Sequence, residues 1–272
     1  MQDVTLHIAW GATTLARLAA HIDVLDADER ARAARFRTQA DRTMYCAAHV
    51  LLRHALSREA APAPAHWRFR RGPHGRPEID TNACPHAGAL RFNLSHTRAL
   101  VCCALTHGES IGVDAECRRA LRDTQDIAAR FFAAEEASAI AAAGPPGSAA
   151  AAQAFQSLWT LKEAYVKAHG LGLAMGLAGF GFQLTGAAPA QIRLRHAQAA
   201  PPAAHWRCLL LQVDGGQCTV AAAVTAATGA RFRALLHTAD TTLEPELAAC
   251  TPATALLPAQ RIADITSPPP AR

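Results

Sequence analysis

Residues 155–171 read FQSLWTLKEAYVKAHGL, and they indicate more about this chain than any other stretch of it. Trp159, Glu163 and Lys167 recur at intervals of four residues, so on a helix they lie along one face. A carboxylate and an amine one helical turn apart can hold a metal ion and a phosphate side by side. The stretch therefore predicts a helix, closed by Gly170, that carries a chemical site on one face.

A second acidic element precedes this helix and reads SIGVDAE from Ser110 to Glu116. Its β-branched residues and Gly112 favour a strand, in which Asp114 and Glu116 point to the same side. Magnesium prefers hard oxygen ligands and takes one or two carboxylates together with phosphate oxygens and water. Three carboxylates and a lysine, drawn from a strand and a helix, thus suit a Mg²⁺-dependent reaction on a polyphosphate.

Each acidic element also has an ordinary structural interpretation. Taken alone, Glu163 and Lys167 match a solvated salt bridge on a helix. Asp114 and Glu116 alone match the polar face of a half-buried strand. The combination and its order favour a functional interpretation.

Together the two elements resemble the paired signature of the 4'-phosphopantetheinyl transferases. That signature is a Gly-hydrophobic-Asp-x-Glu strand, followed some tens of residues later by Trp-x-x-Lys-Glu-Ala-x-x-Lys. The matching residues here run from Ile111 to Glu116 and from Trp159 to Lys167. Two motifs with the expected internal spacing and order make this resemblance specific.

Three further segments strengthen the resemblance. Phe92–Thr97, FNLSHT, is similar to the family's F-N-x-S-H-S/T segment, and Arg130–Glu136, RFFAAEE, is similar to its R-F-F-x-x-x-E helix. Gly75-Arg76-Pro77 resembles a Gly-Lys-Pro motif of the larger, monomeric, surfactin-synthetase-activator-like branch, with arginine in place of lysine. The similarity extends from about residue 4 to about residue 226, and these segments argue against the small trimeric branch.

The resemblance implies an α+β fold of two similar α/β halves related by a pseudo-twofold axis, with the active site at their interface. We place the N-terminal half, with the coenzyme A-binding loops, at residues 1–107, and the C-terminal half, with the metal and catalytic residues, at 108–228. A His-Trp-Arg tripeptide opens a strand in each half, at His66–Arg68 and His205–Arg207, which agrees with a duplication. Residues 229–272 are rich in Ala, Thr and Pro and are expected to form a weakly structured tail with one short helix.

The implied activity is transfer of the 4'-phosphopantetheine group from coenzyme A to a serine of an apo acyl or peptidyl carrier protein. Adenosine 3',5'-bisphosphate is released. The serine attacks the β-phosphorus of a pyrophosphate, so catalysis needs charge neutralisation and proton management. The resemblance implies Mg²⁺ as the metal, with Mn²⁺ as an alternative, and leaves the identity of the carrier protein open.

The resemblance also assigns roles to individual residues. Asp114, Glu116 and Glu163 are the expected metal ligands. The serine proton goes to Glu163 or to Glu136, and Lys167 neutralises or protonates the departing phosphate. The expected coenzyme A-binding residues are Arg32, Arg71, His74, Gly75, Arg76, Pro77, Asn93, Ser95, His96, Asp114, Lys162 and Lys167.

Composition indicates a globular protein. The chain has 272 residues and a mass of 28.7 kDa, and 50% of the residues are hydrophobic, which is enough for a substantial core. No run approaches the roughly 18 apolar residues of a membrane span, and no signal-like segment opens the chain, so we expect a cytoplasmic protein without a membrane partner. The resemblance to the larger branch implies a monomer. The eight cysteines lack a C-x-x-C pair and are expected to be reduced and mostly buried. A zinc site from Cys84, His86 and His107 does not have a compact spacing.

The charge is modestly positive, at +5 with an isoelectric point near 8.9, and arginines crowd residues 30–42 and 68–76. A general nucleic-acid binder would interleave such arginines with aromatic residues, which make up only 6% of this chain. No nucleic-acid partner is therefore expected, and arginine suits a ligand with several phosphates through its bidentate fork. A Mg²⁺-dependent nuclease and a non-catalytic coenzyme A-binding protein stay open as alternatives. The second is disfavoured by the presence of Asp114, Glu116, Glu163 and Lys167.

Hydrophobic patterning predicts the remaining elements. Strands are expected at residues 4–10, 67–70, 99–105, 110–116, 205–213 and 218–225. Helices are expected at residues 28–56, 126–143 and 149–168, and Gly144-Pro145-Pro146-Gly147 separates the last two.

Overall fold

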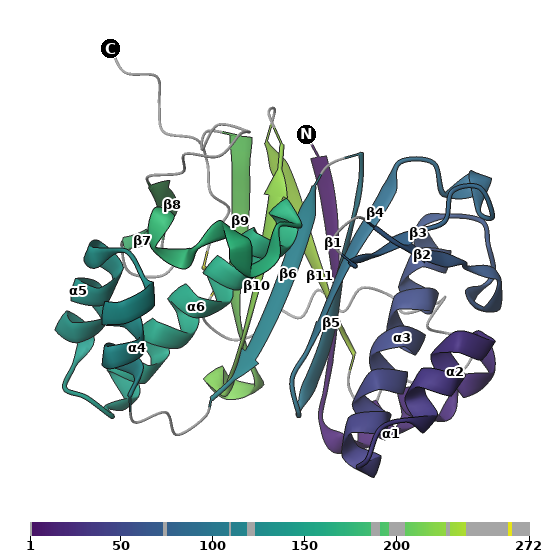
Figure 1. Cartoon of the computed structure of the whole chain (residues 1–272), viewed down its shortest axis with the longest axis horizontal. Helices are drawn as coiled ribbons and strands as arrows, with labels where there is room; N and C mark the ends of the chain where they lie inside the picture. The colour runs from purple at the N-terminus through teal and green to yellow at the C-terminus, as the bar shows by residue number, and fades with distance from the viewer. Residues whose placement is uncertain are drawn as a thin grey trace. The chain divides into compact units, whose positions relative to one another are not determined.

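The computed structural model describes residues 2–72, 75–108, 110–118, 123–185, 191–195, 205–226, 229–237 and 261–262. The chain forms two compact units, and each combines a four-stranded sheet with a helix of 21 residues (Figure 1). Of the described residues, the N-terminal unit contains those within 3–108 and 233–237, and the C-terminal unit contains residue 2, those within 110–232, and residues 261–262. The α+β class expected from the sequence is confirmed.

The sheet of the N-terminal unit has the strand order β11-β1-β5-β4. Its strands are β1 (Gln2–Trp10), β4 (Leu90–His96), β5 (Leu100–His107) and β11 (Ala230–His237). Its helices are α1 (Ala12–Ala20), α2 (Ala27–Ala34) and α3 (Gln39–Glu59). Both β1 and β4 pair antiparallel with β5, and α3 packs against β5 and β4. A ribbon of β2 (Phe69–Arg71) and β3 (Pro77–Ile79) adjoins β4.

The helix predicted at residues 28–56 is in fact two helices, because each has its own N-terminal cap. Asp26 and Glu29 form a capping box at the start of α2, and the side chain of Thr38 caps α3 from an extended backbone conformation. Arg53 of α3 is fully buried, and its guanidinium lies 3.0 Å from the Asp26 carboxylate and 2.7 Å from that of Glu29. This buried ion pair holds α2 against α3.

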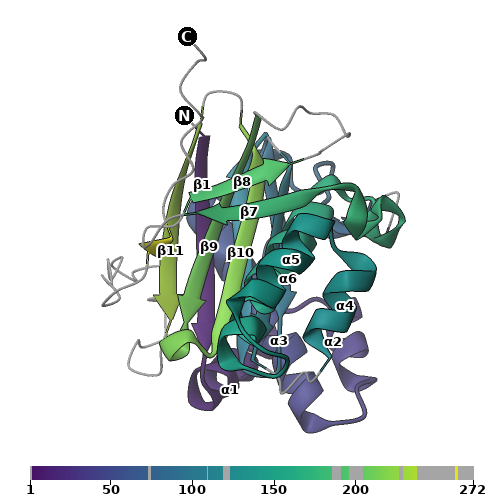
Figure 2. The ribbon, with the colours of Figure 1, turned by 90° about the vertical axis from the view of Figure 1, so that its left-hand side faces the viewer.

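The sheet of the C-terminal unit has the strand order β12-β9-β10-β6. Its strands are β6 (Ile111–Cys117), β9 (Trp206–Val213), β10 (Cys218–Thr225) and β12 (Arg261–Ile262). Its helices are α4 (Thr124–Phe131), α5 (Ala134–Ala143) and α6 (Ala149–His169), and β7 (Gly181–Thr185) pairs with β8 (Gln191–Arg195). The helix α6 packs on β6 and β10, while α4 and α5 pack on α6 (Figure 2).

The helix α6 has the bounds that its sequence predicts to within one residue. The Ser148 side chain accepts a hydrogen bond from the Ala151 N–H at its start, and Gly170 ends it in the left-handed conformation, with φ at 73°. The helix predicted at residues 126–143 divides instead into α4 and α5, because the backbone is extended at Phe132 and Ala133.

Gly112 determines how closely α6 lies to β6. A Cβ atom at this position would lie 2.0 Å from the Ala164 carbonyl oxygen and 2.4 Å from the Ala168 nitrogen. Both are backbone atoms inside a helix and cannot move aside singly. Only glycine therefore permits this approach, which brings one face of α6 to the strand that carries the acidic residues.

Two expectations from the sequence are wrong. Residues 230–237 form β11, next to β1, and are not part of a weakly structured tail. Of the remaining tail, only Gly229 and the two residues of β12 belong to the described chain. The cysteines are not all reduced, since Cys117 and Cys218 form a disulfide. Among the described residues no helix has the length and apolar character that crossing a membrane requires.

Candidate active site

The two acidic elements predicted from the sequence meet in the C-terminal unit. The Lys167 ammonium on α6 donates a hydrogen bond of 2.6 Å to Oδ1 of Asp114 on β6. Asp114 is buried, with 5% of its surface exposed, and Lys167 is half-buried. The helix face that carries the lysine thus lies directly over the acidic side of the strand.

Glu163 lies one helical turn before Lys167 and is half-buried. Burial raises the pKa of the Glu163 carboxyl above its ordinary value, the negative charge of Asp114 raises it further, and Lys167 lowers it. The Glu163 and Asp114 carboxylates are therefore close enough to repel each other. A cation between them would relieve that repulsion.

Glu116 follows Asp114 by two residues and lines a cavity of about 230 Å³. Phe155 and Trp159 form an apolar wall of this cavity, with ring centroids 5.7 Å apart, and Gln156 adds a polar group. The Gln156 amide nitrogen donates to the backbone carbonyl of Glu116 at 2.8 Å. The end of β6 is thereby tied to α6.

The chemistry of the acidic residues fits Mg²⁺. Within the described residues, no group of three or more His, Cys, Asp or Glu side chains is arranged to hold a metal ion. Mg²⁺ needs only one or two protein carboxylates when phosphate oxygens and water complete its shell. Asp114 and Glu163 offer two hard oxygen groups of this kind, and their binding of Mg²⁺, with Glu116 as a third ligand, stays a prediction.

Glu136 and Lys162 form a separate and fully buried ion pair. The Lys162 ammonium lies 2.6 Å from Oε2 of Glu136 and donates to the Phe180 carbonyl, also at 2.6 Å. The Glu136 carboxylate accepts from the N–H groups of Phe182 and Ala133, at 2.8 and 3.1 Å. Burial raises the pKa of Glu136 and lowers that of Lys162, while each partner counteracts the shift of the other. These contacts favour a structural role, in which the pair fastens β7 and α5 to α6, over the roles expected from the sequence.

The other expected coenzyme A-binding residues lie in the N-terminal unit. The Arg76 guanidinium donates to the Phe92 carbonyl at 2.9 Å, which ties the turn before β3 to β4. Burial lowers the pKa of Arg76, and Glu78 raises it. Asn93 and Ser95 are buried on β4.

Five more expected residues are exposed, and a sixth lies outside the described residues. His96 is exposed at the end of β4, and Arg71 is exposed at the end of β2. Arg32 is exposed on α2, with its guanidinium 5.8 Å from the ring centroid of Tyr45. Gly75, with a φ of 77°, lies between β2 and β3, and Pro77 is the first residue of β3. His74 lies outside the described residues.

Sequence reasoning missed Gln156 as a site residue. Its amide donates to both the Glu116 carbonyl and, at 3.0 Å, the Thr219 hydroxyl. Gln156 precedes Glu163 by seven residues, which places the two on the same face of α6. The spacing of seven residues from Glu163 could have identified Gln156 as a site residue from the sequence.

Comparisons with known proteins match both units. A family model described as the 4'-phosphopantetheinyl transferase superfamily matches residues 110–223, and one described as the N-terminal part of 4'-phosphopantetheinyl transferase matches residues 9–107. The 4'-phosphopantetheinyl transferase HetI of Nostoc sp. is 32% identical over 200 residues, which cover 74% of this chain and 78% of HetI. A phosphopantetheinyl transferase of Thraustochytrium sp. is 33% identical over 168 residues, covering 59% of this chain and 57% of the relative. The 4'-phosphopantetheinyl transferase Sfp of Bacillus subtilis is 29% identical over 157 residues, covering 58% of this chain and 65% of Sfp.

Proposed function

The chain belongs to the 4'-phosphopantetheinyl transferase superfamily, in the branch of Sfp and HetI, and from that premise we propose that it transfers phosphopantetheine to carrier proteins. The donor is coenzyme A, the acceptor is a serine hydroxyl of an apo acyl or peptidyl carrier protein, and the second product is adenosine 3',5'-bisphosphate. The observation that carries the proposal is the 2.6 Å contact between Asp114 and Lys167, with Glu163 one turn before the lysine. This contact sets a carboxylate and an amine side by side, and a metal-dependent reaction on a pyrophosphate uses both groups.

Asp114 and Glu163, with Glu116 beside them on β6, would hold Mg²⁺ or Mn²⁺. When bound, the ion supplies Lewis-acid polarisation of the pyrophosphate oxygens. The support for this assignment is the mutual repulsion of Asp114 and Glu163, which raises the pKa of Glu163 in addition to the effect of burial. Without a counter-charge, two such carboxylates are costly to keep together.

Glu163 accepts the proton of the attacking serine, directly or through a water molecule. Glu163 suits this role by position, because it lies one helical turn before Lys167 on the same face of α6. Glu136, the other candidate, is buried and bound to Lys162, which supports Glu163 for this role. Lys167 places its positive charge against the phosphate oxygen that departs with adenosine 3',5'-bisphosphate.

Residues of the N-terminal unit bind coenzyme A in this proposal. Arg76 and His96 contact its phosphates, with Asn93 and Ser95 as further polar contacts on β4. Arg71 is exposed and offers a bidentate guanidinium for a terminal phosphate. Because these contacts do not change when the serine attacks, their loss should raise KM more than it lowers kcat.

The acceptor is proposed to dock beside the end of α6. Leu171 follows the Gly170 cap of this helix and keeps 47% of its surface exposed, so it offers an apolar contact beside the proposed site. The net charge of +5 favours an acidic partner, because complementary charge speeds encounter. The chain acts as a monomer in this proposal.

The test is incubation of the purified chain with coenzyme A, Mg²⁺ and a panel of apo carrier domains, read by intact mass. The expected result is a mass gain of one phosphopantetheine group on at least one carrier, and no gain on the same carrier with its acceptor serine replaced by alanine. The absence of any gain across fatty-acid, polyketide and peptide carriers, with either Mg²⁺ or Mn²⁺, would refute the proposal. Cleavage of nucleic acid by the same preparation would favour a nuclease instead.

A further inference from the structure

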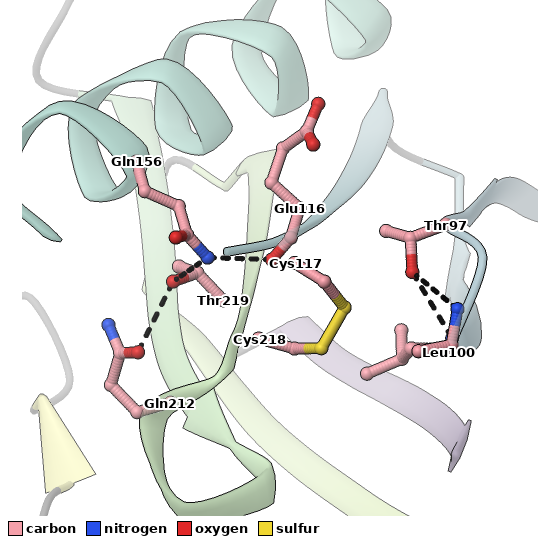
Figure 3. The surroundings of a disulfide bond; sticks show 9 residues. Thr97, Leu100, Glu116, Cys117, Gln156, Gln212, Cys218 and Thr219 are labelled. Carbon is pink, nitrogen blue, oxygen red and sulfur yellow. Dashed lines mark hydrogen bonds between the residues drawn. A yellow bond between two sulfur atoms is a disulfide. The ribbon is translucent and has the colours of Figure 1, made fainter. Parts of the chain in front are cut away.

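The Cys117–Cys218 disulfide closes the end of the strand pair that carries the acidic residues (Figure 3). Cys117 is the last residue of β6 and Cys218 is the first of β10, and the two lie directly opposite each other in the antiparallel register. Beyond them, the Arg118 N–H donates to the Gln217 carbonyl at 2.7 Å. The disulfide therefore links the end of β6 covalently to the start of β10, at a strand end where backbone pairing is weakest.

Glu116 is the residue next to this disulfide. It lies opposite Thr219 in the register, and the Gln156 amide donates to the Glu116 carbonyl and to the Thr219 hydroxyl. Figure 3 shows this amide on one side of the strand end and the disulfide on the other. Because successive side chains of a strand are fixed relative to one another, a shift of the backbone at Cys117 moves Glu116 with it.

A thiol reagent can approach this disulfide from one side. Cys117 is half-buried, whereas Cys218 has only 1% of its surface exposed. An incoming thiolate therefore meets the Cys117 sulfur first. The Cys218 sulfur is then the leaving group.

The remaining cysteines of the described chain offer little competing chemistry. They are buried thiols outside any disulfide, at Cys46, Cys84, Cys102, Cys103 and Cys208. Burial raises the pKa of Cys208 to about 12 and also raises that of Cys103, which withholds the reactive thiolate. Among these residues, redox chemistry is thus directed to the disulfide beside Glu116.

We propose that the Cys117–Cys218 disulfide is a redox-controlled positioning site, which fixes Glu116 when oxidised and loosens it when a dithiol reduces the bond. The inference rests on the proposed function, because it assumes that the acidic residues hold Mg²⁺. Reduction weakens that hold, since a ligand whose support is lost binds its metal less well. The transfer reaction then needs more Mg²⁺ to reach half its maximal rate.

The chemical step is ordinary thiol–disulfide exchange. One thiolate of the dithiol attacks the Cys117 sulfur, a mixed disulfide forms there, and Cys218 leaves as a thiolate that takes up a proton. The second thiol of the reagent then attacks the reagent's first sulfur, which is bonded to Cys117, and Cys117 is released as a thiolate that takes up a proton. The reagent ends as a cyclic disulfide, and the protein gains two thiols.

The test compares the oxidised full chain with the chain reduced by dithiothreitol. Thermal unfolding is followed while Mg²⁺ alone is titrated, and alkylation with mass spectrometry reports the state of Cys117 and Cys218. The expected result is a Mg²⁺ concentration for half-maximal stabilisation that is about tenfold higher after reduction and returns on reoxidation. The double variant Cys117→Ala/Cys218→Ala should behave like the reduced chain with or without dithiothreitol. The control variant Cys208→Ala, which removes a free thiol from β9, should keep the full response.

Two results would overturn the inference: a Mg²⁺ response that is equal or absent in both redox states, or alkylation of Cys117 and Cys218 without reductant. If the double variant does not fold, the oxidised and reduced forms of the wild-type chain can still be compared. Failure of the proposed function can be distinguished from failure of the redox proposal. A chain that transfers nothing but shows the redox-dependent Mg²⁺ response keeps the redox site and loses only the assigned reaction.

Discussion

Replacing Gly112 by alanine tests the close approach of α6 to β6. The new Cβ would lie 2.0 Å from the Ala164 carbonyl oxygen, where contacts shorter than 3.0 Å essentially never occur, so α6 must move away by about 1 Å. The same movement lengthens the 2.6 Å contact between Lys167 and Asp114 beyond the usual limit for a strong hydrogen bond. The site would then lose the geometry on which its chemistry depends.

The structure gives both a stability and a rate expectation for Gly112→Ala. Overpacking of this kind costs roughly 1–3 kcal/mol of unfolding free energy. A misplacement of about 1 Å between reacting groups costs on the order of 100-fold in rate. We therefore expect a folded protein with a lower melting temperature and a kcat/KM for carrier modification about 100-fold below that of the wild type.

The assay is the intact-mass assay on an apo carrier, run beside thermal unfolding. The matched control is Gly179→Ala in the same unit, because a Cβ at Gly179 meets nothing within 4 Å. This control should keep both the wild-type rate and the wild-type melting temperature. A folded Gly112→Ala protein with a wild-type kcat/KM would refute the reasoning that close packing of α6 positions the site.

Three further predictions concern the rest of the molecule. Lys162→Met leaves the buried Glu136 carboxylate without its cation and should lower the unfolding free energy, measured in urea, by roughly 3–5 kcal/mol. Adding Glu136→Gln to this variant should restore part of the loss. An unchanged unfolding free energy of Lys162→Met would contradict a structural role for the pair. Burial lowers the pKa of His237 from 6.5 to about 4 in the folded protein. As the pH falls, the unfolded chain therefore binds a proton at this histidine before the folded chain does. The unfolding free energy should fall by roughly 3 kcal/mol as the pH drops from 6.5 towards 4. His237→Phe, which keeps a ring stacked on His7, should reduce this slope in denaturation experiments at several pH values, and an identical slope would exclude His237 as its source. Leu171→Asp should raise the KM for the carrier several-fold and leave the KM for coenzyme A unchanged in steady-state kinetics. Equal effects on the two KM values would exclude Leu171 from the docking surface.

The elements with strong local patterns could be predicted from the sequence. The strands on either side of Gly108 were predicted and are present as β5 and β6, and the strands predicted at residues 205–213 and 218–225 are present as β9 and β10. The helix α6 was predicted because its residue spacing, the preceding Gly144-Pro145-Pro146-Gly147 breaker and the closing Gly170 agree with one another. The contact between Asp114 and Lys167 follows from two such elements and from the glycine that lets them meet.

The features that were missed depend on partners that are distant in the sequence. The ion pair of Glu136 and Lys162 is buried because β7 supplies two more backbone partners, which the sequence near Lys162 does not reveal. The Cys117–Cys218 bond spans 101 residues and requires the exact register of β6 against β10, whereas cysteine spacing alone leaves the pairing open. Strand β11 gains its place from pairing with β1, although its alternating arginines were a usable local signal.

The most direct measurement is the kcat/KM of Asp114→Asn for carrier modification, compared with that of Glu135→Gln. Asp114→Asn keeps the shape of a buried side chain and removes the charge that pairs with Lys167, whereas Glu135 is an exposed acid that contacts neither. Asp114→Asn should lower kcat/KM at least about 100-fold while the protein stays folded, because the transition state loses a charged contact worth roughly 3 kcal/mol or more. Glu135→Gln should keep the wild-type rate. A folded Asp114→Asn protein that modifies its carrier as fast as the wild type would contradict the assignment of the reaction to β6 and α6.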